Sequence, residues 1–365
     1  MNKRETISAH QLAVLFYAFM TGSAIINIPA PITALAQNGA WISLIIAIAA
    51  GFLFLACMLY LHRQYPTLTF VGHSREILGK YFTMLLFIPF VLFLMLLVSY
   101  IVIDIGAFFT TTMLRETPSY VFHLLILMIA SLTARAGIEV MARMFPLLVY
   151  LMLGFTMLVL VFAYSNYHPE YLLPIMPSGI GPVLEGAYFL YGFPYGEIVV
   201  FAMLLPFVQR KEESALGKYM GTALLVNGLS LIIVTICSIM TAGPYSGEVK
   251  FSVFLIARVI NVQDFVERVE SVISLALVVA SYMKTTIALF ALNLACSQLL
   301  RLQNDRILFF PLTMCCFFLT LVSFKHEIEF AEMIRLQWPL VVAIAAGLPA
   351  LVTTGVCLVK KWFKR

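Results

Sequence analysis

Hydrophobic positions in this chain form long blocks separated by short polar breaks, and the blocks recur from Leu12 to Val359. A run of roughly 20 apolar residues crosses a bilayer as a helix, so each block predicts one membrane span. The pattern predicts an all-α polytopic membrane protein with about ten transmembrane helices, in which residues 1–365 form a single integral membrane domain in the lipid bilayer. The expected spans are 11–37, 40–61, 82–112, 119–134, 144–164, 183–208, 217–242, 268–299, 307–324 and 338–359.

The composition agrees with this pattern and removes several function classes. Hydrophobic residues make up 62% of the chain and charged residues 11%, whereas about a quarter of an ordinary soluble domain is charged. The cysteines lie inside predicted spans without zinc spacing, the histidines are scattered, and no phosphate-binding glycine loop precedes a helix. We therefore expect no enzyme activity, no catalytic residue, no cofactor and no metal site.

The basic residues predict the orientation of the spans. Sixteen of the 23 Lys and Arg residues fall at the two termini and in alternate loops, and six fall in the opposite loops. Cytoplasmic loops carry an excess of Lys and Arg, so both termini are expected in the cytoplasm and the loops near 165–181 and 244–266 outside. This asymmetry accounts for the net charge of +5 without a nucleic-acid partner.

The first predicted span is interrupted by small residues. The stretch FYAFMTGSAIINIP places Gly22, Ser23 and Ala24 in a row and continues to Asn27 and Pro29. Glycine and proline are poor helix formers, and irregular backbone at membrane depth is tolerated only where it is buried in protein or lines a polar cavity. The alternative interpretation is a small-residue surface for helix packing.

The sixth predicted span contains a second interruption. Its middle consists of Phe193, Pro194, Tyr195, Gly196 and Glu197, which combine a proline, a glycine and a carboxylate. A simple proline kink is the alternative interpretation. We favour a functional break, because two interruptions at corresponding places in two halves of a chain indicate a transporter-type site near the midplane.

That correspondence depends on a division of the chain into two repeats. If the ten spans form two sets of five, at 11–164 and 183–359, the first and sixth spans are equivalent members. This predicts a five-plus-five inverted repeat with broken first and sixth helices.

Ionisable residues inside spans are costly and usually face the interior of the bundle. Here they are Asp104 on the third span, Glu197 in the sixth-span break and Lys284 on the eighth span. A structural ion pair between Lys284 and one of the two acids is an open alternative that is compatible with a nearby ligand. The predicted ligand-binding residues come from the two breaks, one face of the third span and the eighth span: Gly22, Ser23, Ala24, Phe93, Leu97, Tyr100, Asp104, Phe193, Pro194, Tyr195, Gly196, Glu197 and Lys284.

Several short strings resemble a known family. The first-span stretch TGSAIINIPAPI is similar to the break in amino acid–polyamine–organocation (APC) permeases. The finer markers resemble one branch of that superfamily, the B subunit of endospore germinant receptors, and together they extend over about two thirds of the chain. These markers are QYP at 64–66, ILGKYF at 77–82, LRETP at 114–118, ARMFPL at 142–147, LLPIMPSGIGP at 172–182 and VERVES at 266–271.

The resemblance implies a LeuT/APC-like fold and a location in the spore inner membrane. It implies a receptor built with an A-type subunit and a C-type lipoprotein subunit, which senses a small nutrient such as an amino acid to trigger germination. The alternative is a freestanding proton- or sodium-coupled amino-acid transporter that uses the same pocket. The chain departs from the family pattern at two places. Ala24 stands where such permeases usually have a second glycine, and the third span carries only Asp104 where the family often has an arginine and an acid.

Lys284 has a specific expected role under this resemblance. Sodium-coupled members of the superfamily hold a cation between the broken first helix and the eighth span. We predict that the Lys284 ammonium is a built-in cation that bonds free carbonyls of the first-span break and Asp104 or Glu197. Function should then be independent of sodium.

Overall fold

A computed structural model describes residues 5–259, 270–302, 305–324 and 326–363, and these residues are helical apart from turns, loops and one isolated β-bridge. The start of the predicted eighth span at 268–269 and most of the VERVES string lie outside the described residues. So do six of the basic residues used for the orientation, which are Lys3, Arg4, Arg268, Lys325, Lys364 and Arg365.

The first half of the described chain contains eight α-helices and three short 3₁₀ turns before the sixth predicted span. They are α1 (Ala9–Thr21), α2 (Ala24–Asn27), α3 (Pro29–Ala36), α4 (Ala40–Gln64), α5 (Phe70–Leu78), α6 (Lys80–Thr112), α7 (Ser119–Ala136), α8 (Ile138–Phe162), η2 (Ala163–Asn166) and η3 (Pro169–Leu172). The remaining 3₁₀ turn, η1 (Gln37–Gly39), joins α3 to α4.

The second half begins with an interrupted helix and ends with a long helical stretch broken by π-helical turns. Its elements are α9 (Ile180–Leu190), η4 (Tyr191–Tyr195), η5 (Glu197–Met203), η6 (Leu205–Phe207), η7 (Arg210–Glu212), α10 (Glu213–Ala242), η8 (Gly243–Gly247), α11 (Ser252–Val259), α12 (Glu270–Leu300), η9 (Asp305–Ile307), α13 (Phe309–Val322), α14 (Glu327–Glu332), η10 (Met333–Gln337), α15 (Trp338–Val342), η11 (Ala343–Gly347) and α16 (Leu348–Phe363).

The first span is interrupted where the small residues predict it. α1 begins at a capping box, in which the Ser8 hydroxyl accepts from the Gln11 amide at 3.0 Å and the Gln11 side chain accepts from the Ser8 amide at 2.9 Å. The helix ends at Gly22, which has φ 6° and ψ −125°. The chain resumes as α2, and Pro29 then occupies the first position of α3, where its missing N–H is no loss.

The sixth span is interrupted more severely. α9 runs into the π-helical turn η4, inside which Phe193 has φ −145° and ψ 113°, an extended conformation in the middle of a helical segment. After Gly196 the chain continues as 3₁₀ helix rather than α-helix in η5. The break is therefore a real change of backbone conformation and not only a proline kink.

Eight helical stretches in the described part of the chain are long and apolar enough to cross a membrane. The sixth and ninth predicted spans are not among them. The sixth is divided by its break into short segments, and the ninth contains only α13, which has 14 residues. This explains the difference from the predicted count of about ten, while the repeat boundaries at 11–164 and 183–359 stay a prediction.

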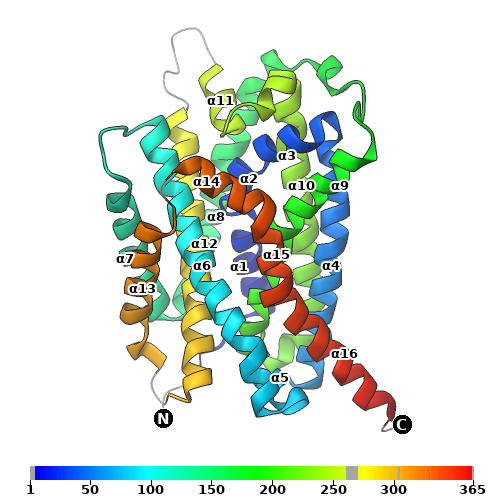
Figure 1. The fold of residues 1–365 in the computed structure, drawn as a ribbon, viewed down its shortest axis with the longest axis vertical. Coiled ribbons are helices and arrows are strands. Elements are labelled where there is room, and N and C mark those ends of the chain that lie inside the picture. Colours follow the sequence, from blue (N-terminus) through cyan, green and yellow to red (C-terminus); the bar gives the residue numbers. More distant parts are fainter. Residues whose placement is uncertain (1–4, 260–269, 303–304, 325, 364–365) are drawn as a thin grey trace.

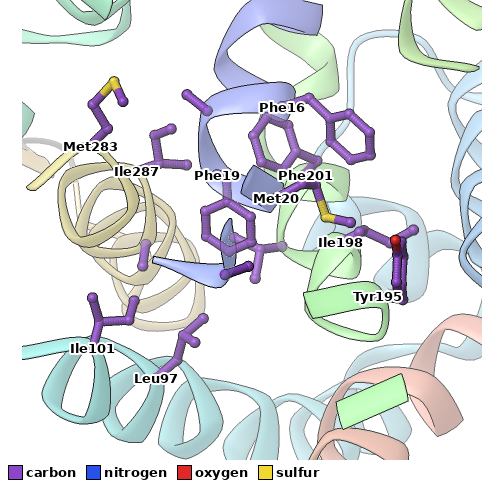
Figure 2. Close-up of a cluster of buried hydrophobic side chains, with 14 of the residues drawn as sticks. Phe16, Phe19, Met20, Leu97, Ile101, Tyr195, Ile198, Phe201, Met283 and Ile287 are labelled. Carbon is purple, nitrogen blue, oxygen red and sulfur yellow. The ribbon is translucent and has the colours of Figure 1, made fainter. Parts of the chain in front are cut away.

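The helices pack as one bundle with the interrupted first span at its centre. α1 lies against α8, α10 and α12, and α12 also packs against α6 and α7 (Figure 1). Apolar side chains from four segments meet around α1, including Phe19 of α1, Leu97 of α6, Phe201 of η5 and Ile287 of α12 (Figure 2). The breaks are thus surrounded by protein, as irregular backbone at membrane depth requires.

Both ends of the described chain lie at the same end of the bundle (Figure 1). There, residues 5–9 form a segment that we name the N-terminal strap. Ile7 pairs with Val208 in a parallel bridge, its amide donates to the Phe207 carbonyl at 2.9 Å, and the Ala9 amide donates to Glu212 at 2.8 Å. The strap therefore joins the start of α1 to the chain that follows the sixth-span break.

Candidate functional site

The two breaks border a cavity of about 320 Å³ together with α6, α12 and the last helical stretch. This volume lies at the lower end of the range that small-molecule sites occupy, roughly 300–1,000 Å³. Most of the lining is apolar and aromatic. The lining residues are Ser23, Asn27, Pro31, Ala34, Leu35, Leu97, Tyr100, Ile101, Asp104, Phe189, Phe193, Glu197, Lys250, Phe251, Lys284, Phe330, Ala331, Glu332, Ile334, Arg335 and Trp338.

A buried ion pair connects the sixth-span break to α12. Lys284 Nζ lies 2.6 Å from Glu197 Oε2, and the two side chains are 0% and 1% exposed. The Trp338 indole N–H donates to the other carboxylate oxygen at 3.0 Å. Breaking such a pair by removing one partner leaves an uncompensated charge in the interior, so the pair holds three segments in one arrangement.

The Lys284 ammonium also faces two aromatic rings. It lies 4.1 Å from the ring centroid of Phe193 in the sixth-span break and 5.1 Å from that of Phe19 in α1. Both distances are within the range of a cation–π interaction. Both broken spans therefore contact the Lys284 ammonium. The sixth span does so through the Glu197 carboxylate and the Phe193 ring, and the first span through the Phe19 ring.

This arrangement differs in one respect from the predicted role of Lys284. Of the two acids proposed as partners, Glu197 forms the ion pair. In the described part of the chain no hydrogen bond is found from the ammonium to a carbonyl of the first-span break. Gly22 nevertheless lies beside the base of the Lys284 side chain, because a β-carbon added at Gly22 would be 3.4 Å from the Lys284 β-carbon.

Asp104 lines the cavity from α6 and contacts the first span. The Asn27 side-chain amide of α2 donates to Asp104 Oδ2. Asn27 follows Ser23 by one helical turn, which places both side chains on the cavity side of α2. The contact joins the first and third spans at the cavity.

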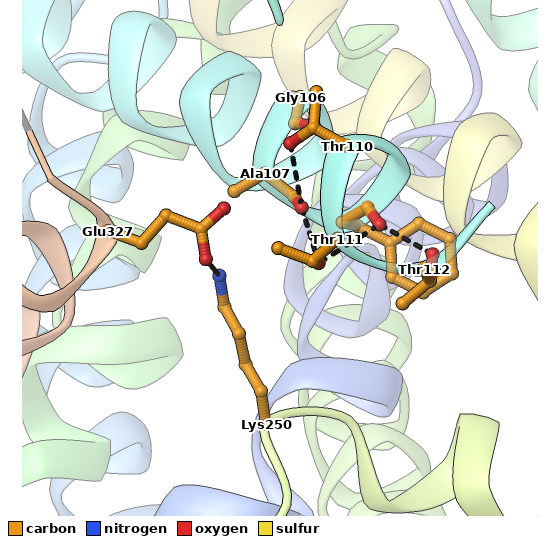
Figure 3. A network of polar contacts seen from close by, with 8 residues as sticks. Gly106, Ala107, Thr110, Thr111, Thr112, Lys250 and Glu327 are labelled. Atoms are coloured by element: carbon orange, nitrogen blue, oxygen red, sulfur yellow. Dashed lines mark hydrogen bonds and ion pairs between the residues drawn. The ribbon is translucent and has the colours of Figure 1, made fainter. Parts of the chain in front are cut away.

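Two further lining cations form ion pairs, both partly exposed, with acids outside the cavity lining. Lys250, between η8 and α11, pairs with Glu327 of α14 at 3.0 Å (Figure 3). Arg335 of η10 pairs with Glu185 of α9 at 2.8 Å. Both pairs attach the last helical stretch to neighbouring segments at the predicted outer end of the cavity.

Aromatic rings form one wall of the cavity. Tyr100 lies 5.2 Å from Trp338 and 5.8 Å from Phe330, measured between ring centroids. Phe93 stacks on Trp338 at 5.5 Å from outside the cavity lining. Such ring pairs are stabilising and can face a cationic group.

The structure brings seven of the thirteen predicted residues to the cavity. These are Ser23, Leu97, Tyr100, Asp104, Phe193, Glu197 and Lys284. The other six lie around it and do not line it: Gly22, Ala24, Phe93, Pro194, Tyr195 and Gly196. Tyr195 packs against Gly51 of α4, and Gly196 contacts Val342, so these two serve helix packing.

Several lining residues were absent from the predicted set. Asn27 could have been included from its place one turn after the small residues. Trp338 and Arg335 come from the last helical stretch, and Lys250 and Phe330 come from segments outside the predicted spans. Nothing in the local pattern of those four residues indicates that they meet the two breaks.

The chain is similar in sequence to proteins of one family. A family model described as "Spore germination protein" matches residues 6–328. Spore germination protein KB of Bacillus subtilis (strain 168) is 26% identical over 316 residues, which cover 85% of this chain and 83% of that protein. Spore germination protein YndE of the same organism is 24% identical over 248 residues, which cover 66% of this chain and 65% of that protein.

Solved structures with the LeuT fold are similar to the whole chain. MhsT in complex with L-phenylalanine has a TM-score of 0.73 at 12% identity and covers 97% of this chain and 89% of its own. A Na⁺-coupled sialic acid symporter in a substrate-bound outward-open state has a TM-score of 0.68 at 12% identity and covers 96% and 78%. The predicted LeuT/APC-like fold is therefore confirmed.

Proposed function

Because the chain belongs to the spore germination protein family, we propose that it is the nutrient-sensing membrane subunit of a spore germination receptor, which binds a small ligand such as an amino acid in the cavity between the two broken spans. The family and the fold are those of permeases and transporters, not of enzymes. The helical spans make it an integral membrane protein.

One observation carries the proposal. Both interruptions contribute side chains to the same cavity, Ser23 from the first and Phe193 and Glu197 from the sixth. A chain has no structural need to interrupt two buried helices beside one cavity, and irregular backbone at membrane depth is tolerated where it lines such a cavity.

A ligand in this cavity would act by favouring one arrangement of the bundle. It would contact the first, third and sixth spans together, so its affinity would differ between arrangements in which these spans are close and apart. A ligand shifts a conformational equilibrium only through such a difference in affinity. Sensing therefore requires no net transport.

The proposal includes partners and a location. The receptor would contain an A-type subunit and a C-type lipoprotein subunit in the spore inner membrane, with both termini of this chain in the cytoplasm. The two described chain ends lie at the same end of the bundle, which supports placing both termini on one side of the membrane (Figure 1).

The orientation can be tested with single cysteines and an impermeant maleimide in intact cells. Ser178, in the exposed loop before α9, should be labelled as Ser178→Cys. Ser214, exposed at the start of α10, should be labelled as Ser214→Cys only after permeabilisation. The reverse result would invert the topology.

A cavity-filling variant tests the site itself. Leu97→Trp would place a larger side chain into the cavity, and Leu85→Trp on the same helix is the matched control, because Leu85 is 68% exposed and Leu97 is 1% exposed. We expect both variants to insert in the membrane and only Leu97→Trp to abolish the germination response. A normal response from Leu97→Trp spores would overturn the proposal.

The second candidate is a freestanding proton- or sodium-coupled amino-acid transporter, favoured by the similarity to a Na⁺-coupled symporter. It predicts uptake of radiolabelled amino acids into liposomes that contain this chain alone. Binding without uptake supports the sensor, and uptake driven by an ion gradient supports the transporter.

A further inference from the structure

The cations that line the cavity in the described residues already have acidic partners. Lys284 pairs with Glu197 at 2.6 Å, Lys250 with Glu327 at 3.0 Å and Arg335 with Glu185 at 2.8 Å. A ligand carboxylate would have to share one of these cations with the acid that already neutralises its charge. The cavity therefore offers little positive charge to an anionic ligand.

The Asp104 carboxylate differs from these paired cations. It forms no ion pair with any described residue, although it lines the cavity, and its hydrogen-bond donor is the neutral side-chain amide of Asn27. Asp104 is thus a cavity-lining carboxylate without a cationic partner within ion-pair distance in the described chain.

Asn27 adds a second acceptor at the same place. Its amide nitrogen is used by Asp104, which leaves its oxygen Oδ1 as the other polar atom of the side chain. That oxygen is buried, and the described residues supply no hydrogen-bond partner for it. A buried acceptor without a donor is unfavourable, so this pair of side chains is incomplete.

A primary ammonium on a ligand would supply a cationic partner for Asp104 and a hydrogen-bond donor for Asn27 Oδ1. It carries a positive charge and three donors and has no acceptor, so one ammonium can bond the Asp104 carboxylate and Asn27 Oδ1 together. The aromatic wall of Tyr100, Trp338 and Phe330 lines the same cavity and suits the apolar part of such a ligand, or the cation itself.

Resting on the proposed function, we infer that the cavity selects its ligand by a primary ammonium group, held by Asp104 and Asn27, and that a ligand carboxylate is dispensable. The ligand class is a small primary amine with an apolar or aromatic body, which includes amino acids and their amides. A carboxylic acid or a sugar would leave Asp104 without a cationic partner at ion-pair distance.

The test compares matched probes on the full-length chain in lipid nanodiscs by calorimetry. The panel contains the protein amino acids, the amides of the same amino acids, the corresponding acids without the amino group, and glucose. We expect the amide of any amino acid that binds to retain its affinity within about tenfold. The acid without the amino group should bind at least a hundredfold more weakly.

Two variants separate the ammonium contact from a structural role of Asp104. Asp104→Asn should weaken ammonium probes by roughly ten- to hundredfold, and should reduce the ratio of affinities between each amine and its deaminated counterpart towards one. Glu76→Gln, an exposed acid on α5 outside the cavity, is the control and should change neither quantity. A merely structural role would lower all affinities and keep the ratio.

The outcomes are distinct for the two proposals. Binding of glucose or of deaminated acids without any amine overturns the ammonium inference and leaves nutrient sensing intact. Amino acids that bind while their amides fail overturn the dispensable carboxylate. If no probe binds and the Leu97→Trp variant germinates normally, both proposals fail.

Discussion

The two interruptions look alike in the sequence, since both combine glycine with proline at the middle of an apolar span, but they serve different contacts. At the first, an added β-carbon on Gly22 would lie 3.1 Å from the Ala18 carbonyl oxygen and 3.4 Å from the Lys284 β-carbon. At the sixth, one on Gly192 would lie 2.7–2.9 Å from three atoms of Pro339, two of them backbone.

The difference shows that glycines in two broken helices can serve different structural purposes. The first break ends a helix, and its glycine allows close approach to the base of the Lys284 side chain. In the sixth break, the glycines allow close packing against α15, while Phe193 and Glu197 supply the side chains that face Lys284. The ion pair is thus the contact through which the two breaks depend on each other.

The largest expected effect follows from removing that contact. Lys284→Met should leave Glu197 buried without its cation and destabilise the protein by about 3–5 kcal/mol, with loss of the ligand response. Thermal unfolding of the nanodisc-embedded chain measures the first effect, and ligand titration measures the second. An unchanged melting temperature in Lys284→Met would contradict the structural importance of the pair.

Two companion variants identify the cause. Lys284→Met combined with Glu197→Gln removes both charges, keeps an acceptor for the Trp338 indole, and should recover most of the stability but not the response. Lys284→Arg should recover little, because a planar guanidinium does not replace a compact ammonium between two rings.

Replacing the glycines of the two breaks is expected to have an intermediate effect on stability. Gly192→Ala forces the backbone of Pro339 to move and should cost about 1–3 kcal/mol, the usual range for overpacking. Gly22→Ala meets atoms at 3.1–3.4 Å, which need a shift of only a few tenths of an ångström, so its cost should be smaller. Equal melting temperatures for the two variants would remove the proposed distinction between the breaks.

A smaller effect is expected where the last helical stretch contacts the sixth span at the surface. The side chains of Arg335 and Glu185 are 51% and 49% exposed, and exposed ion pairs typically contribute about 0–1 kcal/mol. Arg335→Met should therefore lower the melting temperature by no more than a few degrees. A loss as large as that of Gly192→Ala would mean that packing at the sixth break depends on this pair.

The smallest expected effect is that of removing sodium on ligand affinity. If the ammonium of Lys284 takes the place of a mobile cation, replacing sodium by choline should leave ligand affinity unchanged. Affinity that rises with sodium concentration in the wild-type chain would contradict this role for Lys284.

Much of the fold could be predicted from the sequence. Long apolar blocks indicate membrane-spanning helices, and glycine and proline inside such a block indicate a break. The weakest part was the number of long spans. Helix length in the ninth span depends on where its ends pack, and the backbone of the sixth is extended at Phe193, a detail that composition alone does not specify.

The candidate site was predicted in part for a similar reason. Asp104, Glu197 and Lys284 were expected to converge, since charged groups avoid lipid, and all three line the cavity. The pairing of Lys284 with Glu197 depends on helix rotation, which a sequence does not report. Trp338 and Lys250 reach the cavity from distant segments, so only the tertiary structure reveals them.

The N-terminal strap has a consequence for the order of folding during synthesis. The Ala9 amide bonds a carboxylate 203 residues later, and Glu5 pairs with Arg306, 301 residues later. At translation rates of about 5–20 residues per second, roughly 10–40 s separate Ala9 from its partner. The contacts of the strap therefore form after much of the bundle has entered the membrane. Until then, the start of the first helix lacks its final hydrogen-bond partners.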